Sequence, residues 1–244
     1  MSTPSTSIGI LTPTIGSPEL LDCIKSVQSQ TLPVKHYLVI DGKEHLDAVA
    51  SIINRVEDDC VHLRKIVLEE NVGKGWYGHR VFASVPCLMN VDYTLYLDED
   101  NWILPHHVES LYRTLQDSKA QWAYSLRKIY SKEGTYLLDD HCESLGHWTS
   151  YQNYEHIDTS CFFLPTAIAR TFGPAWYGQW GADRQFFAAL RQHVPSYACS
   201  RQHTLCYRLA GNPGSVTGEF FQAGNQIMSE RYPTGYPWTF SSHP

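Results

Sequence analysis

The stretch Tyr93–Trp102 reads YTLYLDEDNW and decides how the rest of the chain is interpreted. Its first half, Tyr93–Leu97, is a short aromatic and aliphatic run of the kind that forms a buried strand. The run ends in three carboxylates, Asp98, Glu99 and Asp100. Carboxylates crowded at the end of an apolar strand repel one another and lose hydration, so they need a compensating cation. Oxygen ligands suit a hard divalent ion such as Mg²⁺ or Mn²⁺, which in turn holds phosphate oxygens.

Composition narrows the class of protein. With 244 residues, 43% hydrophobic and 13% aromatic, the chain can form one large domain or two small ones with a sizeable core. The formal charge of −6 and the absence of a basic run argue against nucleic acid or an anionic membrane as the main partner. No stretch reaches the roughly 18 apolar residues of a membrane span, and the first residues lack the basic region of a signal peptide. Seven cysteines without CxxC spacing indicate reduced core thiols, which predicts a cytoplasmic protein.

Strands and helices alternate in the first hundred residues. The apolar spacing predicts strands over 7–13, 36–40, 62–68 and 93–97, and helices over 18–30, 45–55 and 76–89. This order predicts an α/β fold with a mostly parallel central sheet flanked by helices. Ligands of such sheets bind outside the carboxyl ends of the strands. Those ends carry the polar residues Thr12, Asp41, Asn71 and Asp98–Asp100.

The pattern changes after Pro105. It predicts a helix to about residue 115, strands over 121–130, 136–138 and 161–165, and helices over 165–172 and from 181 onward. The polar and aromatic stretch 146–160 suits a substrate-facing surface. Residues from about 211 onward show no clear periodicity, so we expect a tail there.

Six motifs follow one another in a characteristic order. They are ILTPTIG at 10–16, CIKSVQSQT at 23–31, HYLVIDG at 36–42, ENVGKGWYGHR at 70–80, YLDEDNW at 96–102 and WGADRQF at 180–186. The ordered set resembles the inverting nucleotide-sugar glycosyltransferases of glycosyltransferase family 2, which have the GT-A fold. We therefore expect a single GT-A domain over 1–215, with a nucleotide-sugar-binding half (1–104) and an acceptor-binding half (105–215). Residues 216–244 would form the C-terminal tail.

The resemblance implies a role for five residues of the donor half. Thr12 and Pro13 would line the pocket of the nucleotide base, and Asp41 would accept hydrogen bonds from the base. Asn71 and Arg80 would lie beside the base and the sugar-phosphate, where an arginine fork matches phosphate oxygens. A UDP-sugar is the preferred donor, because a carboxylate can accept from the imide N–H of uracil.

The resemblance also implies a metal site and a catalytic base. Asp98 would bind ribose, metal or metal-bound water, Glu99 would contact the nucleotide, and Asp100 would bind the metal, Mn²⁺ or Mg²⁺. Asp183 would be the base that takes the acceptor's proton. His203 would add a contact to the metal or the diphosphate from the C-terminal part of the chain.

Three departures from the family pattern are visible. The second strand is followed by Asp-Gly-Lys-Glu-His at 41–45 in place of Asp-Gly-Ser-x-Asp, which leaves the identity of the base open. Ala182 precedes Asp183 where a glutamate is common, so one carboxylate is missing near the expected base. The stretch Gly-His-Arg at 78–80 lacks the asparagine that often follows the arginine.

The function implied is metal-dependent transfer of a sugar, with inversion, from a nucleotide-diphosphate-sugar to a hydroxyl of a saccharide or glycoconjugate. A sugar-nucleotidyltransferase would need a glycine-rich, basic N-terminal loop, which ILTPTIGSPEL at 10–20 lacks. A non-catalytic nucleotide- or glycan-binding domain is favoured if Asp183 lies far from the acidic triplet. Paired carboxylates would also serve a hydrolase or mutase on chemistry alone. The purely structural alternative is an acidic turn that caps a strand and is solvated by water.

Overall fold

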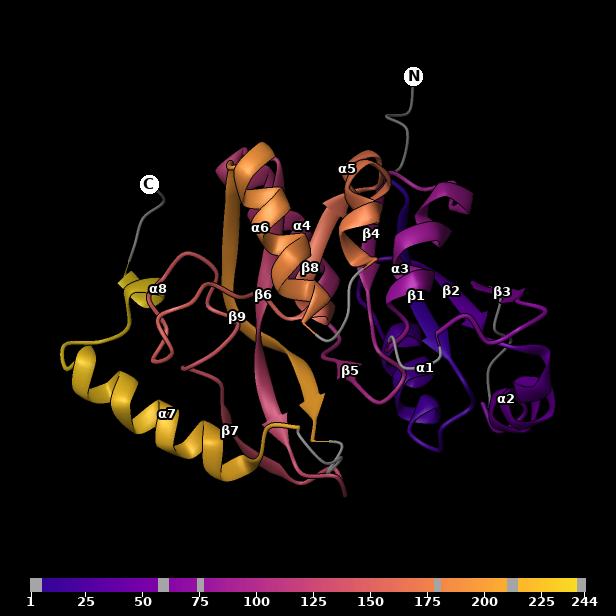
Figure 1. The fold of residues 1–244 in the computed structure, drawn as a ribbon, viewed down its shortest axis with the longest axis horizontal. Helices are drawn as coiled ribbons and strands as arrows, with labels where there is room; N and C mark the ends of the chain where they lie inside the picture. The colour runs from indigo at the N-terminus through magenta and orange to yellow at the C-terminus, as the bar shows by residue number, and fades with distance from the viewer. Residues whose placement is uncertain (1–5, 57–61, 74–76, 178–180, 210–214, 241–244) are drawn as a thin grey trace.

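A single curved sheet runs through the molecule (Figure 1). The structure is a computed structural model that describes residues 6–56, 62–73, 77–177, 181–209 and 215–240. The strand order is β3-β2-β1-β4-β8-β6-β9-β5, with β7 paired to β6. The strands are β1 (Ile8–Thr14), β2 (Lys35–Ile40), β3 (Leu63–Val67), β4 (Tyr93–Tyr96), β5 (Trp102–Ile103), β6 (Trp122–Tyr130), β7 (Tyr136–Asp139), β8 (Phe162–Pro165) and β9 (Tyr197–Arg208).

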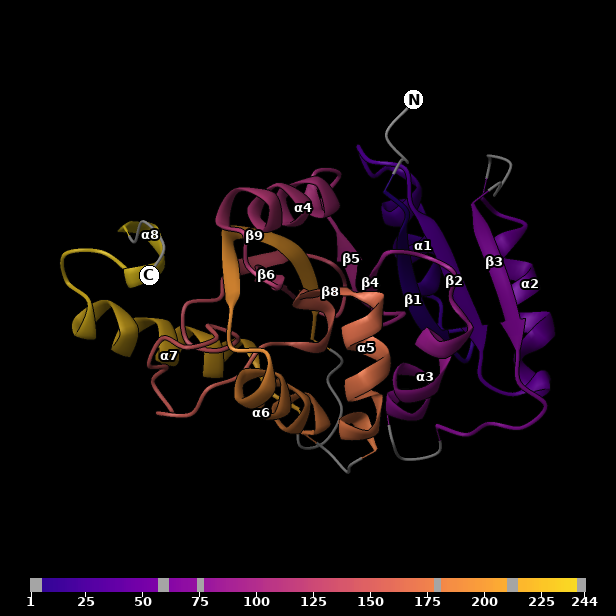
Figure 2. The ribbon, with the colours of Figure 1, turned by 90° about the horizontal axis from the view of Figure 1, so that it is seen from above.

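Helices cover both faces of this sheet. They are α1 (Leu20–Gln28), α2 (Leu46–Ile53), α3 (His79–Ser84), α4 (His107–Ser118), α5 (Thr166–Phe172), α6 (Ala182–His193), α7 (Gly218–Arg231) and α8 (Pro237–Phe240). Seen from above, α4 lies on one side of the sheet, and α3, α5 and α6 lie on the other (Figure 2). No helix of the described ranges is long and apolar enough to cross a membrane.

The predicted α/β arrangement is confirmed, with a refinement in the second half of the sheet. Strands β3, β2, β1 and β4 run parallel, and β1 is buried along its whole length, as expected for a strand covered on both faces. Strand β8 pairs antiparallel with β4 and with β6, whereas β6 and β9 are parallel. The sheet is therefore parallel from β3 to β4 and mixed beyond β4.

Four of these strands and helices were missed from the sequence: β5, β9, α7 and α8. The 12-residue strand β9 escapes an alternation test because its pairing with β6 shifts register twice, and Arg201 within it has a positive φ of 60°. The segment expected as an aperiodic tail contains α7, so that expectation is wrong. The hydroxyl of Thr217 caps α7 by accepting from the N–H of Phe220 at 3.2 Å, and the helix buries Phe221 and Met228 at helical spacing.

Helix α7 lies very close to the loop that follows β7. A Cβ added at Gly224 would come within 2.6 Å of the sulfur of Cys142, so only glycine fits there. Further along the chain, Trp238 of α8 is fully buried. The C-terminal segment is thus packed onto the domain.

The cysteines are mostly core thiols, as expected. Five of the six in the described part of the chain are buried, whereas Cys87 is exposed, and none of the six forms a disulfide. Cys60 lies outside the described residues, and so do positions 74–76 and Trp180 of the sequence motifs.

One buried cation organises the second half of the sheet. Only 4% of Arg127 on β6 is exposed. Its Nε donates to Asp140 Oδ2 at 2.8 Å and its Nη1 to Asp158 Oδ2 at 2.5 Å. The guanidinium also lies over the ring of Tyr207, 4.6 Å from the centroid, and over Phe221 of α7 at 5.2 Å. Arg127 therefore joins the sheet, the loop between β7 and β8, and helix α7.

Removing this cation is expected to destabilise the domain strongly. Arg127→Ala leaves two buried carboxylates without their partner, a change that costs about 3–5 kcal/mol in other proteins. Denaturant unfolding followed by circular dichroism measures the loss. Arg113→Ala is the control, because Arg113 pairs with Glu109 while 73% of its side chain is exposed, and we expect a change within about 0.5 kcal/mol. Equal stabilities for the two variants would contradict the assigned role.

Candidate active site

The residues 98–101 form a turn, called the acidic turn here, which follows β4 and lies next to β9. The main-chain N–H of Asn101 donates to the carbonyl of Asp98 at 3.2 Å and closes the turn. The side chain of Asn101 is 1% exposed, and its Oδ1 accepts from the N–H of Arg208 at 3.0 Å. Arg208 also donates through Nε to the carbonyl of Asp100 at 3.1 Å and through Nη2 to Asp22 at 2.7 Å. These contacts with Arg208 of β9 therefore hold the turn in place.

The carboxylate of Glu99 is hydrogen-bonded to the loop that follows β1. Its Oε2 accepts from the hydroxyl of Thr14 at 2.5 Å and from the N–H of Ser17 at 3.0 Å, and its Oε1 accepts from the N–H of Ile15 at 3.3 Å. A carboxylate with three donors from one loop is a structural clamp. The nucleotide contact of Glu99 stays a prediction, beside this structural role.

Asp98 and Asp100 remain as the carboxylates without a full set of donors. Burial, then the charges of Asp100 and Asp158, raise the pKa of Asp98 well above its usual range, against the hydrogen bond from the Ser160 hydroxyl at 3.1 Å. The amide of Asn101 adds a long contact to the same oxygen at 3.5 Å. Burial, together with the charge of Glu99, raises the pKa of Asp100 to about 6. This concentration of oxygen donors and negative charge fits a hard divalent cation.

The side chain of Thr12 lies in the core. It is 0% exposed, and its Oγ1 lies 3.0 Å from Nε2 of His36 and 3.8 Å from the sulfur of Cys23. The hydroxyl of Thr12 therefore contacts the core, and its part in a base pocket stays a prediction. Pro13 is also buried and packs against Gly78, where an added Cβ would come within 2.7 Å of Pro13 Cγ.

Asp41 fixes the loop that carries Asn71. Its Oδ1 accepts from the N–H of Val72 at 2.7 Å and its Oδ2 from the N–H of Gly73 at 2.8 Å. Only 3% of Asp41 is exposed, so these N–H groups are its partners in this structure, and a contact with the base stays a prediction. A Cβ on Gly73 would lie 2.4 Å from Asp41 Oδ2, which explains the glycine.

Asn71 lies in this loop, and Arg80 follows the loop at the start of α3. The Oδ1 of Asn71 is buried and has no hydrogen-bond partner within the described ranges, so a donor on a bound ligand would satisfy it. Arg80 donates to the carbonyl of Val72 at 3.2 Å, and its guanidinium lies 5.5 Å from the ring centroid of Tyr177. Arg80 thus connects the loop to the segment that precedes α6.

Asp183, at the start of α6, belongs to a chain of three ionisable side chains. Its Oδ2 lies 2.6 Å from His156 Nε2, and His156 Nδ1 lies 3.5 Å from Glu143 Oε2. Glu143 also accepts from the hydroxyl of Tyr154 at 2.7 Å, and that hydroxyl in turn accepts from Arg184 at 2.9 Å. His156 and Glu143 were not singled out from the sequence, although His156 falls within the polar, aromatic stretch 146–160.

The pKa values of this chain of groups show how Asp183 stays ionised. Burial by itself would lower the pKa of His156, but the charge of Asp183, its hydrogen bond to the imidazole and the nearby carboxylate of Glu143 outweigh it and raise the pKa to about 9. Burial would likewise raise the pKa of Asp183, but the cationic His156 and the N–H of Arg184 bring it below its usual range. Asp183 also raises the pKa of Asp98, so the two carboxylates are near enough to interact.

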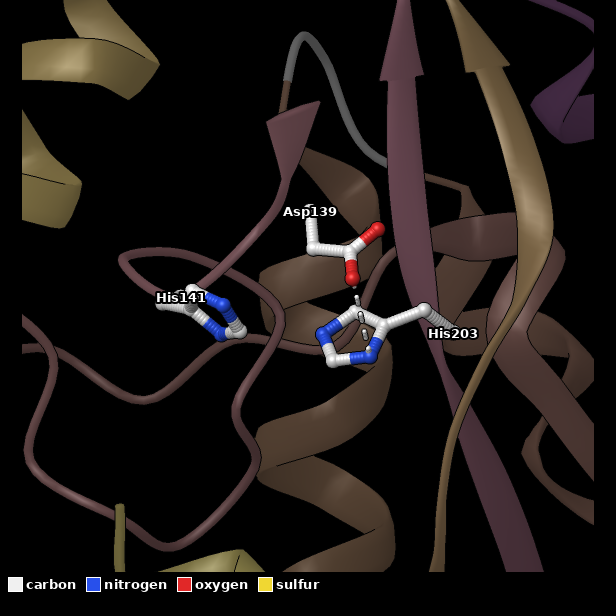
Figure 3. Close-up of side chains that lie close together, drawn as sticks. All are labelled: Asp139, His141 and His203. Atoms are coloured by element: carbon white, nitrogen blue, oxygen red, sulfur yellow. Dashed lines mark ion pairs between the residues drawn. The ribbon is translucent and has the colours of Figure 1, made fainter. Parts of the chain in front are cut away.

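His203 has its contacts away from the acidic turn, so the structure does not bring it together with Asp98 and Asp100. The residue of β9 that contacts Asp100 is Arg208, and His203 lies five residues earlier, about 15 Å along a strand. His203 instead lies next to Asp139 and His141 (Figure 3). Its Nδ1 is 4.0 Å from Asp139 Oδ2.

Comparison with known proteins shows the family of the chain. A model of the family described as Glycosyl transferase family 2 matches residues 10–172, more than half of the chain. The chain belongs to glycosyltransferase family 2. The GT-A fold expected from the sequence motifs is confirmed with it.

Similar proteins align with this family 2 chain over different shares of their length. Hyaluronan synthase of Streptococcus pyogenes is 33% identical over 102 residues, which cover 40% of this chain and 23% of the synthase. The chain thus aligns with less than a quarter of that relative. The crystal structure of S. aureus TarS superposes with a TM-score of 0.62 at 13% identity, covering 93% of this chain and 39% of TarS. TarS 1–349 in complex with UDP-GlcNAc gives 0.64 at 13% identity, covering 92% and 66%.

The pair His156–Asp183 predicts how stability depends on pH. The pKa of His156 is about 9 in the folded protein and 6.5 in the unfolded chain, so its stabilisation is complete below pH 6.5 and is lost as the pH rises through 9. The free energy of unfolding should fall by roughly 3 kcal/mol across that window. Denaturant titrations at several pH values measure it. A His156→Gln variant should show a nearly flat profile, and a fall as steep as in the wild type would rule out this pair as the cause.

Proposed function

We propose that this family 2 glycosyltransferase moves a sugar, with inversion and with the help of a divalent metal ion, from a UDP-sugar to a hydroxyl group of a saccharide or glycoconjugate. The observation that carries the proposal is the separation of two kinds of carboxylate. Asp98 and Asp100 form an oxygen-rich, underneutralised turn, whereas Asp183 is kept ionised by a protonated imidazole. Such a division allows one group to bind a cation and the other to accept a proton.

The comparisons support the choice of substrates. TarS, which has the same fold, is described in complexes with UDP and with UDP-GlcNAc, and this supports a UDP-sugar donor here. The similarity to a hyaluronan synthase supports a saccharide acceptor.

Asp98 and Asp100 would hold the metal ion, Mn²⁺ or Mg²⁺. When bound, the ion would neutralise charge that develops on the leaving diphosphate. The protein's own part is to keep the two carboxylates in place before the ion arrives. Ser160 binds Asp98 through its hydroxyl, and Arg208 holds the main chain of Asp100.

Asn71 and Arg80 would orient the nucleotide. The unpaired Oδ1 of Asn71 can accept from a donor on the base or ribose. The cationic fork of Arg80, at the start of α3, is suited to a phosphate oxygen. The loop between them is fixed by Asp41, which binds two successive N–H groups. Asp41 therefore acts on the nucleotide through this loop.

Asp183 would act as the general base. The acceptor oxygen forms a bond to the anomeric carbon as its proton passes to Asp183, and the bond from that carbon to the diphosphate breaks, releasing UDP. Attack from the face opposite the leaving group inverts the configuration in a single displacement. His156 keeps Asp183 anionic, and the N–H of Arg184 donates to its Oδ1 at 2.9 Å. The carboxylate is therefore ionised and oriented before the acceptor binds.

The substitution Asp183→Asn tests the proposal. Asparagine keeps the shape of the side chain, but it cannot take a proton. We expect kcat for UDP release in the presence of donor and acceptor to fall roughly 10²–10⁴-fold, with UDP affinity nearly unchanged. Asp117→Asn, an exposed carboxylate on α4, should keep wild-type activity.

Three results would contradict the proposal. A rate close to that of the wild type in Asp183→Asn would place the base elsewhere. Binding of UDP without any transfer to saccharide acceptors would favour a non-catalytic nucleotide-binding domain. Release of pyrophosphate from a nucleoside triphosphate and a sugar phosphate would identify a nucleotidyltransferase.

A further inference from the structure

A second group of possible metal ligands lies outside the acidic turn. It consists of Asp139 at the end of β7, His141 two residues later, and His203 on β9 (Figure 3). One ligand atom from each of the three side chains lies within 4.8 Å of the other two. Ligands of one tetrahedral ion with bonds of about 2.0–2.2 Å lie roughly 3.3–3.5 Å apart. A shift of about 1 Å by these half-buried side chains would therefore close the site.

Each of these three side chains has a polar atom without a hydrogen bond among the described residues. The 4.0 Å between Asp139 Oδ2 and His203 Nδ1 is too long for a hydrogen bond. The buried Nδ1 of His141 has no hydrogen-bond partner among the residues that the structure describes. The ring of His141 is nearly perpendicular to that of His203, at 89°, with 5.1 Å between their centroids. Each residue thus offers a polar atom that the fold does not satisfy.

The outer contacts match those of metal-binding side chains. His203 Nε2 lies 3.3 Å from the carbonyl of Asp140, to which it can donate, and this leaves the lone pair of Nδ1 on the side of Asp139. A ligating imidazole usually donates its other N–H to such a carbonyl. Asp139 Oδ1 accepts from Lys128 at 2.8 Å and from the hydroxyl of Tyr136 at 3.1 Å, so Oδ2 is the oxygen left over.

The C-terminal helices hold the two neighbouring ligands in place. Asn225 of α7 accepts from the N–H of His141 at 2.9 Å and donates to the carbonyl of Asp139 at 2.7 Å. The ring of His141 stacks on Tyr236, with 4.4 Å between centroids and 23° between planes. A metal ion here would join β9 to the end of β7 and to His141, on which Asn225 and Tyr236 of the C-terminal segment pack.

We propose that Asp139, His141 and His203 bind one divalent transition-metal ion, with Zn²⁺ as the best match, and that this ion fastens the C-terminal helices to the sheet. Two imidazoles and one carboxylate are the ligand set that zinc takes in proteins with three protein ligands, the fourth position being open to water. Mg²⁺ and Ca²⁺ prefer oxygen ligands alone. The site is separate from the proposed catalytic metal site, because it shares no residue with the acidic turn.

The test uses the full chain freed of metal by a chelator and titrated with ZnSO₄. We expect one Zn²⁺ per chain, a rise in the midpoint of thermal unfolding as the native state binds the ion, and slower hydrogen exchange in 218–231. His203→Ala and the isosteric Asp139→Asn should each weaken Zn²⁺ affinity at least about 10–100-fold, since even supporting contacts matter that much. His62→Ala, an exposed histidine, is the control and should bind as the wild type does.

Two further measurements distinguish this site from other metal-binding groups. Co²⁺ should give visible bands of nitrogen and oxygen ligation without the near-ultraviolet band of thiolate ligation, because the free cysteines take no part. Asp100→Asn should retain Zn²⁺ binding, so loss of the catalytic site and loss of this site are told apart. The proposal is overturned if no site of one Zn²⁺ per chain exists, if the thiolate band appears, or if His203→Ala and Asp139→Asn bind Zn²⁺ as tightly as His62→Ala.

Discussion

The guanidinium of Arg127 carries a full charge although only 4% of the residue is exposed, and the frame of the active site is arranged around it. Its two carboxylate partners each bind further groups. Asp140 accepts from the N–H groups of Cys142 and Glu143, which fixes the start of the loop that leads to His156. Asp158 accepts from the N–H of Ser160 at 3.0 Å, and the hydroxyl of Ser160 reaches Asp98. A continuous series of buried hydrogen bonds therefore runs from the middle of the sheet to the acidic turn. Because buried charges are stable only with partners in good geometry, a change at any member should be felt along the series.

The carboxylates of the molecule divide by the donors that surround them. Glu99 and Asp41 are each bound by main-chain N–H groups and act as clamps on loops beside the proposed donor pocket. Asp98 and Asp100 have few donors and raise each other's cost of ionisation, so a cation is the natural partner. Asp183 is bound by a cationic imidazole and stays anionic. In the proposed mechanism one type of side chain thus supplies scaffolding, cation binding and proton acceptance, and the local donors distinguish the three roles.

Sequence reasoning was strongest where a motif coincides with a strand end. The strand Tyr93–Tyr96 and its acidic turn, the helix beginning beside Asp183, and the order of the first four strands all lie where apolar spacing and motif order placed them.

Sequence reasoning failed where a role depends on contacts between distant parts of the chain. Thr12 sits at a strand end yet points into the core, because the pleat of β1 puts alternate residues on opposite faces and both faces are covered. Neither the pairing of His156 with Asp183 nor that of His203 with Asp139 could be inferred from one sequence, since each joins segments 27 or more residues apart. Helix α7 was within reach: Thr217 and the spacing of its apolar residues are cues that the glycine-rich composition obscured.

The central claim is that the acidic turn binds nucleotide through a metal ion. Calorimetric titration of the wild-type chain with UDP, once in Mn²⁺ and once in chelator, tests it most directly. The account predicts binding of one UDP per chain in Mn²⁺ and an affinity at least about 10-fold lower in chelator, a difference of about 1.4 kcal/mol or more. UDP affinity that is the same in both conditions would contradict the claim and leave Asp98 and Asp100 as parts of a strand cap.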